Sequence, residues 1–488
     1  MTTSVEERPV KSLVPVRMDK MPWSRFHWMV IFGLGTAWIL DGLEIQIVAA
    51  AGYAKDLDMN STEVGATATV YLIGQVVGAL FFGRLTDKLG RKKLFIITLA
   101  VYLLGSGIAG FAPNMWFLWI FRFVAGAGIG GEYSAINSAI DELMPGKYRG
   151  RVDLAINGTY WAGAVLGSLG SSFLLDTDRF AENIGWRIAF FIGPVLGLII
   201  IFLRRHIPES PRWLVTHGQG EEAERIVSGI EQSVRENGKE PPHLDESQAW
   251  WIKAHEGVTF RQLRYVFLEL YPTRTVLGLT LMITQSFLYN AIFFTSSLVL
   301  QNFYGKTPAS AALYFFPFAI GNLLGPLILG RFFDTVGRRK MIGGSYSIAA
   351  AVLFVSSLLF QADLLSAGTH TALWCLSFFF ASAGASAGYL TVSEIFPLEV
   401  RGQAISYFFS IAQIFGAVGP LIFGALIGEG TDRGPLFWGY VGASIIMLIG
   451  GLVAFKFGVD AEGKALEDIA PPLSTYDENG NQLTKLPV

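Results

Sequence analysis

The stretch GRLTDKLGRKK at residues 83–93 decides the fold, because nearly the same pattern returns as GRFFDTVGRRK at residues 330–340. Each copy lies between two long apolar segments. A second pattern repeats at a similar offset, since Glu142 and Glu394 are each followed by a proline three residues later and by Arg-Gly seven residues later. Two patterns repeated in this way indicate duplicated units. The sequence therefore predicts two similar halves, an arrangement typical of a transporter.

The composition places the chain in a membrane. Of its 488 residues, 52% are hydrophobic and only 16% are charged, which is too apolar for an ordinary soluble enzyme. Stretches of about twenty apolar residues, which cross a hydrocarbon core of roughly 30 Å as a helix, recur along the chain. They lack the alternation of membrane β-strands, so we predict an all-α polytopic membrane protein. The twelve predicted spans are 26–49, 64–84, 94–112, 114–140, 153–174, 185–204, 273–300, 308–332, 341–361, 367–392, 402–426 and 434–457.

The spans fall into two groups of six around a polar middle. Lys and Arg concentrate after the second, fourth and eighth spans, so the positive-inside rule places both termini in the cytoplasm. Within the connector, 220–234 and 262–270 predict amphipathic helices against the membrane face. The predicted units are a cytoplasmic N-terminal segment 1–25, a six-helix bundle 26–204, a cytoplasmic connector 205–272, a second six-helix bundle 273–457 and a cytoplasmic tail 458–488.

Composition and motifs also exclude several classes of function. The formal net charge of −2 gives no reason to expect nucleic acid. The single cysteine, Cys375, excludes an internal disulfide and a cysteine-based metal cluster. Neither a phosphate-binding loop nor a nucleophile elbow is present. We therefore expect no enzyme activity, cofactor or metal. We also expect a monomer in the inner or plasma membrane, with lipid, protons and a small-molecule substrate as its partners.

Six spans, a polar connector and six further spans with repeated loop patterns resemble the major facilitator superfamily over residues 26–458. The stretches PESPRWL at 208–214 and EGKALE at 462–467 are similar to signatures of its sugar porters and their organic-ion relatives. The resemblance implies the major facilitator fold, with two six-helix pseudo-repeats, and alternating access for a small organic solute.

The repeated loop patterns carry a predicted conformational gate. Acidic side chains near a helix N-terminus are stabilised by roughly 0.3–1 kcal/mol, and the resemblance implies that Asp87 faces the start of the eleventh span and helps to hold the outward-open state. In the alternative interpretation, these charges act only as topology signals and lipid headgroup anchors. The predicted gating residues are Arg84, Asp87, Arg91, Glu142, Arg149, Arg331, Asp334, Arg338, Glu394 and Arg401.

Four charged residues lie well inside predicted spans, where a charge is costly and indicates function. Asp41 and Glu44 share a helical face in the first span, and Arg122 and Glu132 lie in the fourth. The stretch DGLE at 41–44 resembles an element of metabolite proton symporters, and the region around Arg122 resembles the fourth helix of sugar porters. This resemblance implies a Glu44–Arg122 pair, whose separation would let Glu44 take up a proton.

Two alternatives to this coupling pair stay open. Asp41 is the titrating group in the first, with Glu44 or Glu132 in a structural role. In the second, Glu44 and Arg122 form a static buried ion pair.

The predicted solute site lies between the halves near the midplane. In the seventh span, Gln285 and Asn290 match two positions of the sugar porters' amide pattern, whereas Thr284 and Leu288 replace two others. The site is therefore less like a sugar cage. The further predicted lining residues are Asn157, Tyr160, Trp161 and Gln413, with helix packing as the alternative for the aromatic ones.

Together these features predict a secondary active transporter, a proton-coupled symporter of an organic acid or a sugar-like metabolite. A uniporter or a proton-linked exporter is the alternative within transport. A non-transporting nutrient sensor is disfavoured, because such proteins carry a larger cytoplasmic extension than residues 458–488.

Overall fold

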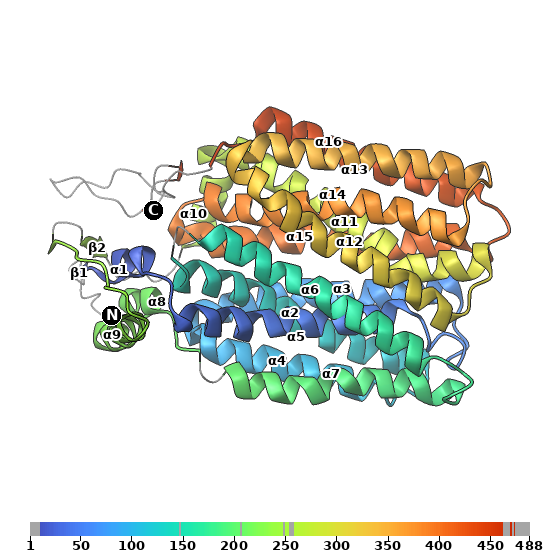
Figure 1. The fold of residues 1–488 in the computed structure, drawn as a ribbon, viewed down its shortest axis with the longest axis horizontal. Coiled ribbons are helices and arrows are strands. Elements are labelled where there is room, and N and C mark those ends of the chain that lie inside the picture. Colours follow the sequence, from blue (N-terminus) through green and yellow to red (C-terminus); the bar gives the residue numbers. More distant parts are fainter. Residues whose placement is uncertain are drawn as a thin grey trace.

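The computed structural model describes residues 10–145, 148–204, 207–246, 249–252, 258–461, 469–470 and 473. Twelve long helices run side by side along the long axis of the molecule (Figure 1). The first group comprises α2 (Arg25–Ala49), α3 (Ser61–Leu89), α4 (Arg91–Ala109), α5 (Met115–Leu143), α6 (Arg149–Leu174) and α7 (Glu182–Arg204). The second group comprises α11 (Pro272–Tyr304), α12 (Pro308–Thr335), α13 (Arg338–Gln361), α14 (Ala367–Ile395), α15 (Leu398–Ile427) and α16 (Gly434–Phe457).

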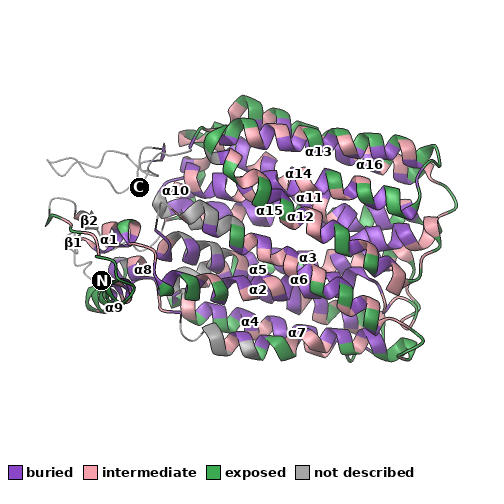
Figure 2. Cartoon of the chain, in the orientation of Figure 1, coloured by how far each residue is buried: buried purple, intermediate pink, exposed green. Residues whose placement is uncertain are grey.

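The all-α membrane architecture predicted from the sequence is confirmed. Within the described residues, nine helices are long and apolar enough to cross a membrane, namely α2 to α4 and α11 to α16. Exposed side chains lie on the outer faces of the bundle (Figure 2), and many of them are large and apolar, such as Phe32, Trp116 and Leu198. An outer surface of this kind suits contact with lipid chains.

Glycines allow the helices of the first half to touch along their backbones. A Cβ atom at Gly163 of α6 would lie 1.9 Å from the carbonyl oxygen of Ile39, and one at Gly42 of α2 would lie 2.0 Å from that of Tyr160. In the α3–α5 contact, a Cβ atom at Gly78 would lie 1.9 Å from the carbonyl oxygen of Ala127. Small residues at such positions are how membrane helices approach closely. They hold the polar side chains of α2, α3 and α5 near one another.

The two halves meet where α3 packs on α15 and α6 packs on α12. The Thr69 hydroxyl donates to the carbonyl oxygen of Ala417 at 2.7 Å, and the Ser406 hydroxyl donates to that of Ala79 at 3.3 Å. These bonds lie along the α3–α15 contact. The halves are therefore joined by hydrogen bonds from hydroxyl groups to backbone carbonyls, and each of these bonds can break without breaking the others.

The remaining elements gather at one end of the bundle (Figure 1). They are α1 (Val14–Lys20), α8 (Pro211–Thr216), α9 (Gly220–Glu236) and α10 (Phe260–Tyr265), which continues into the π-helical turn Val266–Leu270. The predicted amphipathic segments 220–234 and 262–270 thus coincide with helical structure. Strands β1 (Val10–Ser12) and β2 (Trp250–Ile252) form an antiparallel pair that the sequence did not predict.

The apolar face of α9 is covered by α1 and α8. Val227 and Ile230 are buried in the same cluster as Val14 and Met18. Arg17 of α1 forms ion pairs with Glu224 and Glu231 of α9. The described part of the N-terminal segment therefore packs on the connector, because an amphipathic helix needs a cover for its apolar side.

Candidate functional site

A buried ion pair joins α2 to α5. The Arg122 guanidinium pairs with the Glu44 carboxylate, and the two side chains are 0% and 1% exposed. The guanidinium carbon also lies 4.2 Å from the ring centroid of Tyr71 on α3, a cation–π geometry. The structure thus brings together the two residues that the resemblance paired.

Asp41 lies beside this pair and has different partners. Its carboxylate accepts hydrogen bonds from the hydroxyls of Tyr71, at 3.0 Å, and Tyr133, at 3.2 Å. The residue is completely buried, and no Lys or Arg among the described residues forms an ion pair with it. Asp41 is therefore an acid held by hydroxyl groups, whereas Glu44 is held by a cation.

Glu132 is also buried and precedes Tyr133 on α5. It is close enough to interact electrostatically with Asp41. All four predicted proton-coupling residues therefore belong to one buried region of the first half.

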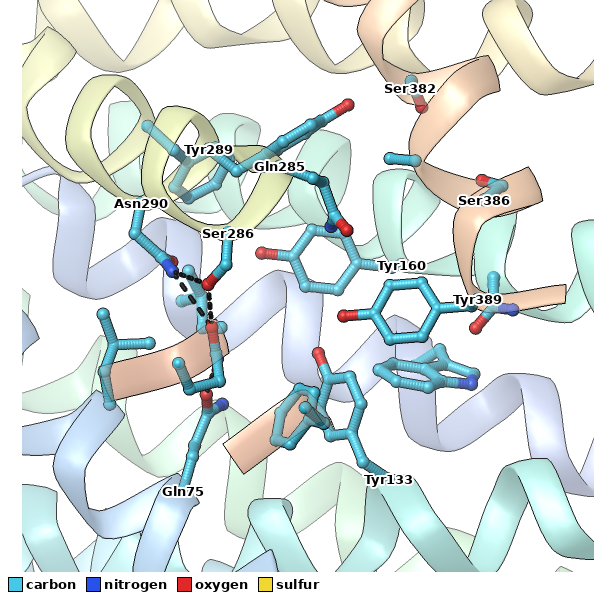
Figure 3. A pocket seen from close by; sticks show the side chains of 18 of the residues that line it. Gln75, Tyr133, Tyr160, Gln285, Ser286, Tyr289, Asn290, Ser382, Ser386 and Tyr389 are labelled. Atoms are coloured by element: carbon cyan, nitrogen blue, oxygen red, sulfur yellow. Dashed lines mark hydrogen bonds between the residues drawn. The ribbon is translucent and has the colours of Figure 1, made fainter. Parts of the chain in front are cut away.

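A cavity lies next to this cluster, between the two halves. It encloses about 930 Å³ of space not filled by protein atoms, its opening included. The hydroxyls of Tyr133, Tyr160 and Tyr389 and the amide of Gln285 point toward the same space (Figure 3). The lining residues come from α2, α3, α5, α6, α11, α14 and α15, so both halves contribute. None of the described lining residues is charged.

Gln413 of α15 is the centre of a polar network at one side of the cavity. Its amide donates to the Oε1 atom of Gln75 on α3 at 2.6 Å, and its own Oε1 atom accepts from Asn290 of α11 at 3.2 Å and from Ser286. The dashed line between Asn290 and Ser286 in Figure 3 marks one bond of this network. The network joins α3 of the first half to α11 and α15 of the second. A movement between the halves would therefore break it.

Aromatic side chains form another part of the wall. The ring centroid of Trp161 on α6 lies 5.8 Å from that of Tyr289 and 5.9 Å from that of Phe293, both on α11. The Tyr289 hydroxyl donates to Asn322 of α12 at 3.0 Å. The two ring contacts of Trp161 cross between the halves, so Trp161 both packs against the second half and lines the cavity.

All six residues predicted to bind solute line the cavity: Gln285, Asn290, Asn157, Tyr160, Trp161 and Gln413. Sequence reasoning missed Gln75, Tyr133 and Tyr289. An amide in an apolar helix needs a partner, and this signal could have identified Gln75. Aromatic residues are common throughout the chain, and nothing in the sequence distinguishes Tyr133 from them.

The structure shows part of the predicted gate. Arg338 at the start of α13 forms an ion pair with Glu394 near the end of α14. Arg401 of α15 is buried, Glu142 of α5 is half-buried and Arg331 of α12 is exposed. The side chains of Arg84, Asp87, Arg91, Arg149 and Asp334 lie outside the described part of the chain.

Two helix bundles with a polar cavity between them and buried charges beside it are typical of membrane transporters. The family described as "Sugar (and other) transporter" matches residues 43–472. The chain belongs to this family.

Curated relatives and solved structures agree with this assignment. The chain is 26% identical to the niacin transporter NiaP of Acinetobacter baylyi, covering 93% of this chain and 98% of the relative. It is 27% identical to the major myo-inositol transporter IolT of Bacillus subtilis, covering 92% and 93%. The identity to the glucose transporter GlcP of Staphylococcus epidermidis is 28%, covering 85% and 90%.

Among solved structures, the fold is similar to that of the proton:xylose symporter XylE, a major facilitator superfamily protein, with a TM-score of 0.71 at 18% identity, covering 91% of this chain and 98% of that one. The protein is thus a sugar or metabolite transporter with the major facilitator fold, and not an enzyme.

Proposed function

We propose that this protein carries a small organic solute across the cell membrane together with protons. The bundles 26–204 and 273–457 alternate around the cavity, with both chain termini in the cytoplasm. The observation that carries the proposal is the buried cluster of Asp41, Glu44 and Arg122 directly beside the solute cavity. Buried acids inside membrane helices are costly, and proton relays are a common reason for their presence. XylE, which has a similar fold, is a proton:xylose symporter.

The cavity favours an uncharged solute that has polar groups on one side and an apolar face on the other. Its described lining offers amides and hydroxyls but no cation, and Arg122 is engaged by Glu44. A carboxylate bound there would lose water without gaining an opposite charge, which is unfavourable. Trp161 and Phe293 offer ring faces to an apolar surface. Of the compounds in the relatives' names, glucose and myo-inositol fit this chemistry better than the anion of niacin.

For the gate, we propose that the Arg338–Glu394 pair breaks and re-forms during the transport cycle. It joins the start of α13 to the end of α14, at the end of the bundle where α8 and α9 lie. Glu142, Arg331 and Arg401 complete the charged set among the described gating residues.

Uptake into proteoliposomes tests the symport. Glucose, myo-inositol and niacin are screened for thermal stabilisation of the purified protein, and the compound that stabilises it is then followed with and without an imposed pH gradient. Accumulation above equilibrium should require the inward proton gradient and should vanish with a protonophore. Equilibration that ignores the gradient would indicate a uniporter instead.

Two variants sharpen this assay. Glu44→Gln and Asp41→Asn each remove an acid while keeping the size of the side chain. At least one of them should abolish accumulation while preserving counterflow exchange, because exchange needs only alternating access. Retention of uphill uptake by both variants would exclude these carboxylates as the coupling groups.

A further inference from the structure

Tyr133 occupies a position shared by three parts of the machinery. Its hydroxyl donates to Asp41 at 3.2 Å, and its side chain lines the cavity (Figure 3). Its ring stacks on Phe409 of α15, with centroids 4.8 Å apart and planes 25° apart, and meets the edge of Trp38 at 4.1 Å. Tyr133 therefore touches a buried acid, the solute space and the second half of the molecule.

The other hydroxyl donor to Asp41 has none of these additional contacts. Tyr71 is completely buried, and Arg122 covers its ring. It is not among the residues that line the cavity. The two tyrosines thus make similar bonds to the same carboxylate from different surroundings.

Protonation of Asp41 must change one of these two bonds. An ionised carboxylate accepts hydrogen bonds at both oxygens, but a protonated one has an O–H group that donates. The tyrosine hydroxyl bonded to that oxygen then faces a weaker acceptor, so its bond weakens or reverses. Tyr71 is completely buried and does not line the cavity, whereas water or solute in the cavity can become a new partner of Tyr133. Tyr133 is therefore the tyrosine that changes its hydrogen-bond partner.

We propose that Tyr133 is the positioning residue that links the proton on Asp41 to the solute cavity and, through Phe409, to the second half of the transporter. The proposal rests on the proposed proton symport. With Asp41 ionised, the hydroxyl faces the cavity but its hydrogen is committed to the carboxylate. With Asp41 protonated, it is released into the cavity as a donor, and the stacked contact with Phe409 shifts with it. Proton binding and solute binding then favour each other to the same extent, as linkage requires.

Other titratable groups also face Asp41, and Tyr133→Phe leaves all of them unchanged. They come from five helices: Glu44 from α2, Tyr71 from α3, Tyr102 from α4, Arg122 and Glu132 from α5, and Tyr160 from α6. Tyr133→Phe keeps the ring and its packing but removes the bond to Asp41. Tyr71→Phe removes the matching bond on the other side of the same carboxylate, so it is the control.

The test measures how the arrangement of the two halves depends on pH without any ligand. Spin labels are placed at Asp178 in the α6–α7 loop and at Glu429 in the α15–α16 loop, both exposed, in a Cys375→Ala background. Distance distributions in nanodiscs are recorded from acidic to mildly alkaline pH. The wild type and Tyr71→Phe should show a pH-dependent redistribution, which Tyr133→Phe should lose.

Several outcomes would overturn the proposal. One is a pH response of Tyr133→Phe like that of the wild type. Another is an equal loss of the response in both phenylalanine variants, which would indicate a structural role. A wild type without any response would overturn it as well, even if liposome uptake is proton-driven. Failure of the symport itself appears separately, as uptake that ignores the gradient.

A second measurement needs no variant at Tyr133 and so survives if that variant fails to fold. Infrared difference spectra of the wild-type protein are recorded over the same pH range. The carbonyl band of a protonated carboxylic acid should appear together with a change in a tyrosine C–O band, at the same midpoint. Titration of the acid without a tyrosine change would refute the proposed role.

Discussion

Removing the Arg122 guanidinium should destabilise the protein more than removing both charges of its ion pair with Glu44. Both side chains are buried completely or almost so. In Arg122→Met the Glu44 carboxylate stays buried without its cation. Breaking a buried pair in this way costs about 3–5 kcal/mol. A Coulomb estimate agrees, since two unit charges roughly 4 Å apart at an effective dielectric constant of about 20 attract each other by about 4 kcal/mol.

The double variant Arg122→Met/Glu44→Gln should recover most of this loss. A glutamine has no charge to desolvate, and a pair of neutral side chains of similar volume is often as stable as the ion pair it replaces. The coupling energy of the double-mutant cycle should therefore be about 3 kcal/mol, well above the error expected for independent sites.

The assay is reversible unfolding in mixed micelles, followed by tryptophan fluorescence, with all four proteins measured at one pH. Coupling below about 0.5 kcal/mol, the range of additive sites, would refute the reasoning. In proteoliposomes, the double variant should be folded and yet unable to accumulate solute. Uphill uptake by a stable double variant would show that the pair is only structural.

Three further perturbations test other parts of the structure. Gln413→Leu removes the centre of the polar network and leaves its partners unsatisfied. Solute affinity measured by calorimetry should therefore fall about 10- to 100-fold, a loss of about 1–3 kcal/mol in binding free energy. Unchanged affinity would contradict the assigned site. Gly163→Ala places a methyl group against the backbone of α2 and should cost about 1–3 kcal/mol of stability. At Gly170 on the same helix, an added Cβ atom has nothing within 4 Å, so Gly170→Ala should be neutral or slightly stabilising. Arg17→Ala should speed amide hydrogen exchange in α1, because its ion pairs with α9 are lost. Arg225→Ala, which removes an exposed ion pair within α9, should leave exchange in α1 unchanged. Equal exchange in the two variants would show that apolar packing alone holds α1.

Much of the architecture could be predicted because the membrane restricts what a chain can do. A span of about twenty apolar residues has to satisfy its backbone internally, so the helices follow from composition and length. The paired loop patterns at 83–93 and 330–340 added the duplication. The β1–β2 pair and the cover of α9 by α1 could not be predicted, since both depend on contacts between segments far apart in sequence.

The solute site was predictable where chemistry marks single residues. Gln285, Asn290 and Gln413 are amides in apolar helices, which need partners wherever they lie. Tyr133 carries no such mark, because a tyrosine packs in a membrane bundle as readily as it binds a ligand. Its role follows only from the hydrogen bond between its hydroxyl and Asp41, which depends on the tertiary structure.

The sequence alone determined that this is a duplicated helical transporter, with its charges in the first half and amides in the second, because hydropathy and repeated motifs are properties of the chain itself. Only the tertiary structure decided the partners of Asp41, which are two tyrosines, beside the Glu44–Arg122 pair that the family resemblance implied. Residues 41 and 44 are neighbours on one helix face, and their partners come from α3 and α5. Backbone contacts at glycines such as Gly42 and Gly78 set which partner each acid meets, and no local pattern records that arrangement.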